Sequence, residues 1–315
     1  MLSVIIPAYN EEKCIQSAYD VIHSLLCENK IDCEFIFVDD GSKDQTYQVI
    51  TELSRKYKNI TGLHFSRNFG KESAISAGLA SVNGDCAVVI DCDLQHPPEK
   101  IIEMYRLWEQ GYEIVEGIKK ERGQEKKMHS LGAKIFYSAI SRMAGFDMAN
   151  SSDFKLLDRK VVDVLNKMPE RGFFRAISYW VGYHKTTVTY NVGMRVDGES
   201  KWSTGELVKY AISNISSYST APMQIVTALG VVMLIISAIL GGWTLVDKIV
   251  GRSLEGIPTV IIITIFIGSI IMISLGIIGY YIARIYEEIK GRPKYIISSA
   301  VKSTQEKSIA IEPYK

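Results

Sequence analysis

The sequence predicts an α/β protein with a mostly parallel sheet, followed by two helices that cross a membrane. Three observations support this class. Short apolar runs alternate with amphipathic segments over residues 1–120, two carboxylates follow one of those runs, and two long stretches near the C-terminus carry no charge. Alternating strands and helices indicate a parallel sheet with helices on both faces. A chain of 315 residues can form one large domain or two smaller ones.

The individual elements follow from the hydrophobic pattern. Apolar runs predict strands at Val4–Ile6, Glu34–Val38, Gly62–Phe65, Ala87–Ile90 and Thr186–Tyr190. Amphipathic patterning predicts helices that start near Glu11, Lys43, Lys71 and Pro98, and a further helix that starts at Arg159 and is capped by Asp158. Proline is favoured in the first turn of a helix, which supports the start near Pro98.

The run Cys86–Ile90 leads directly into Asp91-Cys92-Asp93. An apolar run of this length is typical of a buried strand, so both aspartates should lie at the carboxyl edge of the sheet, where open α/β sheets bind ligands. Oxygen ligands at this edge suit Mg²⁺ or Mn²⁺ that bridges the phosphates of a nucleotide. Such a motif is common by chance in a chain with 35 acidic residues, and its position after a strand gives it weight.

Two other predicted strands end in polar residues beside this edge. The first leads into Pro7-Ala8-Tyr9-Asn10-Glu11, and the second into Asp39-Asp40-Gly41-Ser42. A carboxylate there can accept a hydrogen bond from a base imide N–H, and Tyr9 can pack against a base or ribose. The same residues also suit a tight turn in which Ser42 or Asp44 caps the next helix, so both interpretations stay open.

The C-terminal third predicts a membrane hairpin. Met223–Val246 and Ile257–Ala283 contain no charged residue, and each exceeds the roughly 20 residues that cross a bilayer core. Basic residues lie mainly on the outer sides of the two stretches: Lys201, Lys209, Arg284, Lys290, Arg292 and Lys294. The positive-inside rule therefore places both termini in the cytoplasm. Residues 204–221 predict an amphipathic helix that lies in the membrane interface.

Composition narrows the function classes. The net charge is +1, and no basic helix interleaved with aromatics points to nucleic acid. The five cysteines show neither C-x-x-C spacing nor ligand spacing with histidine, which favours reduced thiols over a disulfide framework.

Six motifs, taken in order, resemble those of the polyisoprenyl-phosphate glycosyltransferases. This group of family 2 glycosyltransferases contains bactoprenol glucosyltransferases and dolichol-phosphate mannose synthases. The motifs are Pro7–Glu12, Val38–Ser42, Arg67–Lys71, Asp91–Glu99, Ser152–Asp158, and Arg195 with Gly198–Trp202. The resemblance covers essentially the whole chain. Two positions depart from the usual pattern: Cys92 stands where a small residue such as alanine is common, and His96 replaces a common aspartate. His96 could ligate a metal, but a solvated or indirect role is favoured.

The resemblance implies a GT-A type nucleotide-diphospho-sugar transferase fold and a division of the chain into four parts. Residues 1–203 would form the catalytic domain, 204–221 the juxtamembrane amphipathic helix, 222–284 the two-helix transmembrane hairpin and 285–315 a cytoplasmic tail. We expect the polar tail after Ile297 to be loose.

The resemblance also implies roles for single residues. Donor contacts fall on Pro7, Tyr9, Glu11, Asp39, Asp40, Asp91, Asp93, Gln95 and Lys201. Asp93, with Asp91, would bind Mg²⁺ or Mn²⁺, and Asp153, Asp93 and Arg195 would be catalytic. The acceptor phosphate would be held by the basic residues Arg122, Lys127 (beside Lys126), Arg142 and Arg195. The family suggests Asp153 as a base. A phosphate monoester with a second pKa of about 6 is already mostly a dianion near neutral pH, so sugar positioning is at least as good an interpretation.

The implied reaction is an inverting, metal-dependent transfer of one hexose, glucose or N-acetylglucosamine, from a UDP-sugar to undecaprenyl phosphate. It would take place at the cytoplasmic face of the inner membrane and supply cell-envelope polysaccharide modification. The first alternative is a polyprenyl-phosphate mannose synthase that uses GDP-mannose. A processive polysaccharide synthase is disfavoured because its Gln-x-x-Arg-Trp signature is absent from the sequence. A non-catalytic flippase partner is disfavoured because the spans carry no charge. We expect a homo-oligomer embedded in the bilayer, since two spans pack poorly alone.

Overall fold

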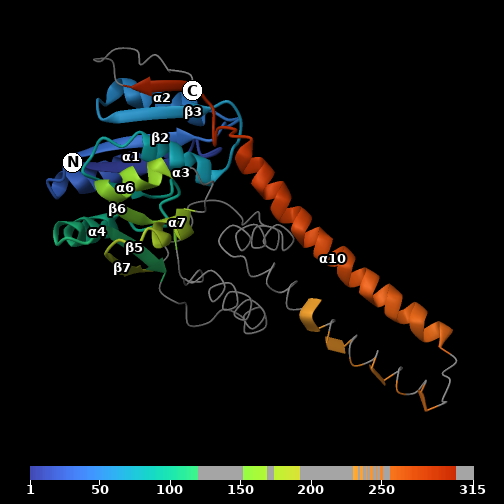
Figure 1. The fold of residues 1–315 in the computed structure, drawn as a ribbon. Helices are drawn as coiled ribbons and strands as arrows, with labels where there is room; N and C mark the ends of the chain where they lie inside the picture. Colours follow the sequence, from blue (N-terminus) through green and yellow to red (C-terminus); the bar gives the residue numbers. More distant parts are fainter. Residues whose placement is uncertain are drawn as a thin grey trace. The chain divides into compact units, whose positions relative to one another are not determined.

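The computed structural model describes residues 1–119, 152–168, 174–191, parts of 230–250, and 256–302. The chain forms two compact units, Met1–Lys201 with Pro293–Lys315, and Trp202–Arg292. In the described part of the first unit the strands form one sheet in the order β7-β5-β6-β4-β1-β2-β3-β8 (Figure 1).

Strands and helices alternate through the first half of this unit. The strands are β1 (Leu2–Ala8), β2 (Cys33–Asp39), β3 (Ile60–Phe65), β4 (Cys86–Val89) and β5 (Ile114–Lys119). The helices between them are α1 (Ile15–Glu28), α2 (Thr46–Lys56), α3 (Lys71–Ala80) and α4 (Glu99–Glu109). After these come β6 (Lys155–Asp158), α6 (Arg159–Lys167), α7 (Phe174–Trp180) and β7 (Lys185–Tyr190). The sequence-based strands are confirmed, and Asp158 caps α6 as expected, because its side chain accepts a hydrogen bond from the N–H of Lys160.

The sheet is mixed, with a parallel centre. Parallel pairing joins β1 to β2 and to β4, and also β2 to β3. On the far side, β6 runs antiparallel to both β4 and β5. The order of the parallel strands reverses at β1, so the chain leaves β1 and β4 toward opposite sides. In doubly wound folds such a switch point opens a crevice at the carboxyl edge of the sheet.

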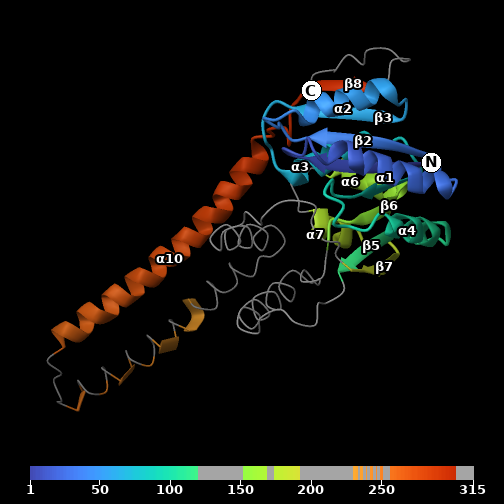
Figure 2. The same ribbon diagram turned by 180° about the vertical axis from the view of Figure 1, so that it is seen from behind.

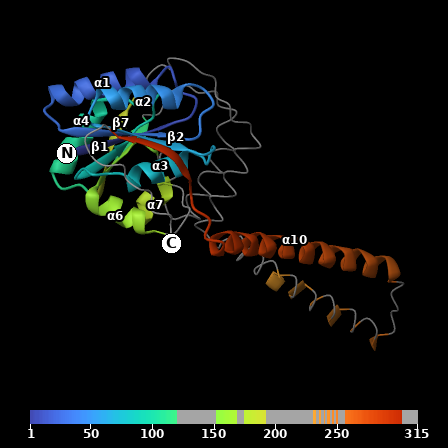
Figure 3. The same ribbon diagram turned by 90° about the horizontal axis from the view of Figure 1, so that it is seen from above.

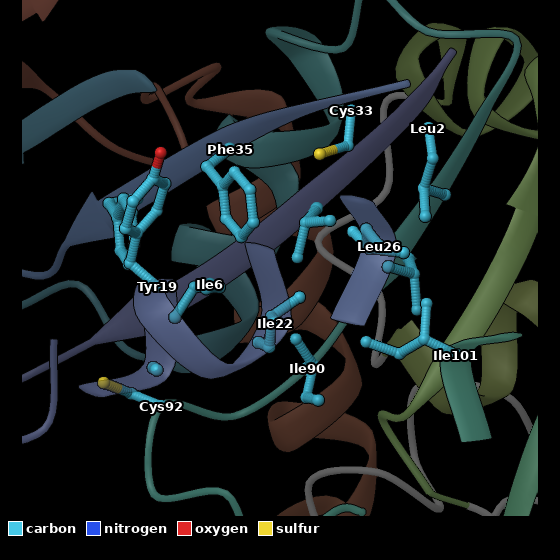
Figure 4. Packing of buried hydrophobic residues seen from close by; sticks show 14 of the residues in the cluster. Leu2, Ile6, Tyr19, Ile22, Leu26, Cys33, Phe35, Ile90, Cys92 and Ile101 are labelled. Atoms are coloured by element: carbon cyan, nitrogen blue, oxygen red, sulfur yellow. The ribbon is translucent and has the colours of Figure 1, made fainter. Parts of the chain in front are cut away.

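Two hydrophobic layers cover the sheet. One consists of α1, α2 and α4 packed on residues such as Leu2, Ile6 and Phe35, and Figure 4 shows Tyr19, Ile22 and Leu26 of α1 in this layer. The other consists of α3, α6 and α7 packed on Ile5, among others. Figure 3 shows the two helix layers on opposite faces of the strands. The continuous apolar strands reflect burial on both faces.

The last strand corrects one expectation. The tail after Ile297 was expected to be loose, but its first residues belong to β8 (Ile297–Lys302), which pairs antiparallel with β3 at the sheet edge. The apolar residues Ile297 and Val301 are partly buried in this strand, while the polar residues between them are exposed. A Cβ at Gly62 would collide with Ile50 of α2 and with Val301 of β8, so the glycine makes room for both the helix and the returning strand. A short segment with two partly buried apolar residues gives little sign of this role, because an edge strand needs few buried side chains.

The second unit contains α10 (Ile257–Ile289), a single long helix in Figure 2. Among the described residues, one helix is long and apolar enough to cross a membrane. It is α10, through the window Phe266–Ala283 with a mean hydropathy of 2.0. The proposed first span and residues 204–221 lie largely or wholly outside the described residues.

Candidate active site

The candidate site lies where β1, β2 and β4 end. Ala8 of β1 pairs with Asp39 of β2, and the loop after β4 begins at Ile90 and leads into Asp91. Because these strands are parallel, their carboxyl ends meet at one edge of the sheet, at the switch point beside β1. The three motifs that the sequence placed at strand ends are therefore brought together.

The loops after β1 and β2 are joined by hydrogen bonds. Asn10 N–H donates to Ser42 Oγ at 2.8 Å, and Lys43 N–H donates to Asn10 Oδ1 at 2.9 Å. Glu11 N–H donates to Thr46 Oγ1 at 2.8 Å. These side-chain acceptors satisfy backbone donors that no strand or helix would pair. Tyr9 is exposed at this edge, with 42% of its surface accessible, so it is free to meet a ligand, whereas Pro7, two residues earlier, is buried in β1.

Asp39 and Asp40 are both buried and engaged in holding loops. Asp39 Oδ1 accepts from Ser42 N–H at 3.0 Å, and Asp40 accepts from the N–H groups of Phe69 (2.6 Å) and Gly70 (2.9 Å). Burial nevertheless raises the pKa of Asp40 above its usual value, although these two bonds oppose the shift. The pair was expected to contact the donor. The contacts that the structure shows hold the loops after β2 and β3 in place, and the donor contact stays a prediction.

Glycine is required where two of these loops approach each other. Gly41 has a φ of +67°, and a Cβ there would collide with the backbone of Arg67. The loop after β2 can therefore pack directly on the loop after β3. That second loop carries Asn68, Phe69 and Gly70 into the start of α3.

Three carboxylates face one another at the edge. Cys92 is buried in the core (Figure 4), whereas Asp91 and Asp93 on either side of it are partly exposed. Burial, followed by the negative charges of Asp93 and Asp91, raises the pKa of Glu11. Asp93 Oδ1 also accepts from the N–H of Gln95 at 3.1 Å.

The carboxylates at this edge could ligate a metal ion if their number and geometry suit one. Within the described residues, no group of three or more histidine, cysteine or acidic side chains has the geometry of a complete metal site. Mg²⁺, however, is commonly held by one or two carboxylates, with substrate phosphates and water completing its shell. Asp91 and Asp93 fit that mode because they supply hard oxygens on the exposed side of the strand end, where negative charge is crowded.

The ammonium group of Lys71 bridges Asp91 to a further carboxylate, that of Asp153. Lys71, the first residue of α3, places Nζ 2.5 Å from Asp91 Oδ1 and 3.1 Å from Asp153 Oδ2. Arg175 on α7 donates from Nε to Asp153 Oδ1 at 2.7 Å and from Nη2 to Oδ2 at 3.0 Å. Burial would raise the pKa of Asp153, but the hydrogen bonds from Arg175 and the charge of Lys71 hold it well below the usual range. Asp153 is therefore a carboxylate with both oxygens in use.

A buried ion pair lies behind Asp153. Lys155 Nζ is 3.2 Å from Glu116 Oε1 and 2.8 Å from Ser178 Oγ, and only 2% of the Lys155 side chain is exposed. Glu116 Oε1 accepts the N–H of Ser152 at 3.1 Å, and Lys155 Nζ donates to the carbonyl of Arg175 at 3.4 Å. The Glu116–Lys155 pair thus fixes Ser152, the residue before Asp153, and the backbone of Arg175, whose side chain binds Asp153. Burial lowers the pKa of Lys155, against the charge of Glu116.

His96 and Glu72 are two further titratable groups of this region. His96 stacks on Phe154 with ring centroids 5.0 Å apart, and its buried Nδ1 has no hydrogen-bond partner. Burial lowers the pKa of His96, which favours the neutral ring. Burial and the neighbouring charge of Asp153 raise the pKa of Glu72 to about 7, although this carboxylate accepts the N–H of Phe174 at 2.8 Å.

Among the described residues, the structure gathers Pro7, Tyr9, Glu11, Asp39, Asp40, Asp91, Asp93, Gln95 and Asp153 around this edge. The basic residues Arg122, Lys126, Lys127, Arg142, Arg195 and Lys201 lie outside the described residues, and their roles stay predictions.

Sequence reasoning missed Lys71, Arg175 and the pair Glu116–Lys155. Lys71 could have been found, because it directly follows a strand-end loop in one of the quoted motifs. Arg175 carries no sequence signal, since it meets Asp153 only through the packing of α7.

Comparison with known proteins identifies the class to which this protein belongs. The family model for glycosyl transferase family 2 matches residues 3–165, and the chain belongs to that family. The fold is the GT-A type, and the protein is a glycosyltransferase. Its crystal-structure neighbours include a mycobacterial protein that is 20% identical, covers 69% of this chain and 73% of its own, and superposes with a TM-score of 0.50. That likeness concerns the fold alone.

Curated relatives narrow the class. An uncharacterised glycosyltransferase of Synechocystis is 37% identical over 94% of this chain and 94% of its own length. A prophage-derived bactoprenol glucosyl transferase of Shigella flexneri is 34% identical over 95% of this chain and 98% of its own. A prophage bactoprenol glucosyl transferase homologue of Escherichia coli is 35% identical over 96% and 99%. These matches confirm the resemblance that the sequence motifs indicated.

Proposed function

We propose that this protein transfers one hexose from a UDP-sugar to a polyprenyl phosphate, with undecaprenyl phosphate the expected carrier, at the cytoplasmic face of the membrane. The observation that carries the proposal is the bridge from Asp91 through Lys71 to Asp153. It joins the strand end suited to a nucleotide diphosphate to a carboxylate fixed beside it. The names of the bactoprenol glucosyl transferases, similar over nearly the whole chain, support the acceptor class.

The donor would lie across the carboxyl edge. Tyr9 would pack on the base or ribose, and the loops tied together by Asp39 and Asp40 would form the base pocket. Asp91 and Asp93 would hold Mg²⁺ or Mn²⁺, which would neutralise charge that grows on the leaving diphosphate. Glu11 and Gln95 lie beside these aspartates and would complete the polar wall of the donor site.

Asp153 would position the sugar. Its oxygens already accept hydrogen bonds from Arg175 and lie beside Lys71, so it has little affinity for a proton. A phosphate acceptor with a second pKa of about 6 is mostly ionised near neutral pH and needs no strong base. Its oxygen would attack the anomeric carbon as the nucleoside diphosphate leaves from the opposite face, which inverts the configuration.

Lys71 would supply positive charge where phosphates meet. Its ammonium group lies between two carboxylates, and 42% of the whole side chain is exposed. The ammonium can also donate to a phosphate oxygen placed beside Asp91. Arg195 and Lys201 would add to this charge on the donor side, and Arg122, Lys127 and Arg142 would hold the acceptor phosphate.

The membrane part would place the reaction at the lipid surface. We propose that 222–284 is a two-helix hairpin of which α10 is the second span, that 204–221 lies in the interface, and that 1–203 and 285–315 are cytoplasmic. A homo-oligomer would shield the two spans. GDP-mannose is the second candidate donor.

The test uses membranes that contain the protein, undecaprenyl phosphate and Mn²⁺ or Mg²⁺, with radiolabelled UDP-glucose, UDP-N-acetylglucosamine and GDP-mannose supplied separately. Label in the organic phase from one donor, lost in Asp93→Asn, would support the reaction and the metal role together. Asp163→Asn is the matched control, since this aspartate forms an exposed pair with Arg159 within α6. No lipid-soluble label from any donor, in protein that binds UDP, would refute the acceptor.

A further inference from the structure

One row of paired residues crosses four neighbouring strands, beginning beside the proposed pocket for the nucleotide base. Ala8 pairs with Asp39, Asp39 with His64, and His64 with Ser299. The row starts at Ala8, the last residue of β1, and ends on β8, the strand that follows α10 in the chain. It therefore reaches from the proposed base pocket to a segment that the sequence predicted to be loose.

His64 is the central link of this row. Its Nδ1 lies 2.6 Å from Asp39 Oδ2. An ionised carboxylate only accepts hydrogen bonds, so Nδ1 carries the proton and donates it. Asp39 is fully buried, and its other oxygen accepts the N–H of Ser42. Ser42 in turn accepts the N–H of Asn10. His64 is therefore connected, through Asp39 and Ser42, to the loops after β1 and β2.

The strand β8 and helix α2 hold His64 in place. Tyr47 of α2 stacks on the imidazole with ring centroids 4.5 Å apart and is hydrogen-bonded to Ser299. Ser298 Oγ donates to the backbone carbonyl of His64 at 3.1 Å. The β3–β8 ladder is irregular between His64 and Phe65. Beyond the irregularity, Tyr295 stacks on Phe65 at 5.1 Å. Residues 295–299 thus contact β3 both at His64 and at the neighbouring Phe65.

We infer that His64 is a positioning residue for nucleotide binding and that β8, through Tyr47, completes the base pocket from behind. The inference rests on the proposed function, because it assumes that a nucleotide binds at the loops after β1 and β2. His64 does not touch the nucleotide. It fixes Asp39, and Asp39 fixes the loops.

The test measures UDP affinity by titration calorimetry with the full-length protein in detergent micelles and Mn²⁺. His64→Asn keeps an amide N–H near the position of Nδ1, whereas the amide of His64→Gln reaches the position of Nε2 instead. We expect a dissociation constant within twofold of wild type for His64→Asn and about tenfold weaker for His64→Gln. In turnover assays the KM for the sugar nucleotide should rise in His64→Gln, with kcat changed by less than threefold.

His184→Gln is the matched control, because this histidine also stacks on a tyrosine, Tyr112, but precedes β7 at the opposite edge of the sheet. It should bind UDP as wild type does. Ser299→Val removes the hydroxyl that meets Tyr47 while keeping a strand-forming residue, and it should weaken UDP about threefold. It keeps the test decisive if His64→Gln does not fold.

The outcomes separate the two proposals. Equal loss in His64→Asn and His64→Gln, or wild-type affinity in His64→Gln or Ser299→Val, would overturn the positioning role while the proposed function stands. Absence of binding of UDP to the wild-type protein would instead overturn the UDP donor of the proposed function, and the inference with it.

Discussion

Replacing Lys71 by methionine should remove most turnover and leave the protein folded. Its ammonium is the cation that contacts both Asp91 and Asp153, and methionine keeps most of the side-chain volume without the charge. Asp153 retains both hydrogen bonds from Arg175, so the substitution leaves no unpaired buried carboxylate. The consequence should fall on the reacting phosphates.

The magnitudes follow from exposure. Breaking a fully buried ion pair costs about 3–5 kcal/mol, but Lys71 is 42% exposed and solvent screens its interactions. We expect a loss of about 1 kcal/mol in the free energy of unfolding. Removing one preorganised electrostatic group from an active site typically costs about 10²- to 10³-fold in kcat, and we expect a loss in that range for Lys71→Met.

The assay is transfer of label to polyprenyl phosphate at saturating donor, with denaturant unfolding measured in parallel. Lys100→Met is the control, because Lys100 forms an ordinary surface pair with Glu103 at 2.6 Å and should change neither readout. Activity of Lys71→Met within threefold of wild type would refute the role of the ammonium group. A stability loss of several kcal/mol would show that its role is structural instead.

Three further predictions follow from the same network. Lys155→Met should destabilise the fold by about 3 kcal/mol because it leaves Glu116 buried without its cation; the double variant Lys155→Met/Glu116→Gln should recover part of the loss in denaturant unfolding, and additive losses would argue against the pair. Asp40→Ala should cost about 2 kcal/mol, since the N–H groups of Phe69 and Gly70 lose their acceptor, and should raise the KM for donor; an unchanged midpoint of unfolding would contradict this. Burial raises the pKa of Glu72 to about 7 from 4.5, so its stabilising contribution is fully present below pH 4.5 and is lost as the pH rises through 7. In Glu72→Gln the thermal midpoint of unfolding should therefore depend less on pH between pH 5 and 8. The same pH dependence as in wild type would exclude Glu72 as its source.

Local features of this protein could be predicted from the sequence. The run Cys86–Ile90 has no polar residue because it is buried on both faces, and this places Asp91 and Asp93 at the sheet edge. The cap at Asp158 follows from the geometry of a helix start and is confirmed. Such features depend on neighbouring residues and on alternation, both of which are visible in one chain.

Features that depend on remote packing could not be predicted. Arg175 reaches Asp153 across 22 residues because α7 packs beside β6, and no periodicity reports that contact. Asp39 and Asp40 were expected to face a ligand because acidic residues at strand ends often do. Their hydrogen bonds to His64 and to backbone N–H groups could not be predicted from the sequence, and their contact with a donor stays a prediction.

The pairing of β8 with β3 has a consequence for how the chain is made. Ser298 bonds to His64 across 234 residues of sequence, so during synthesis the β3 edge stays open until the apolar segments have been completed. An open edge can recruit another strand, and nascent domains with such edges are prone to misassembly. A fragment cut before the apolar segments would keep this edge permanently bare. Attaching residues 293–302 through a flexible linker should restore a soluble, monodisperse catalytic unit.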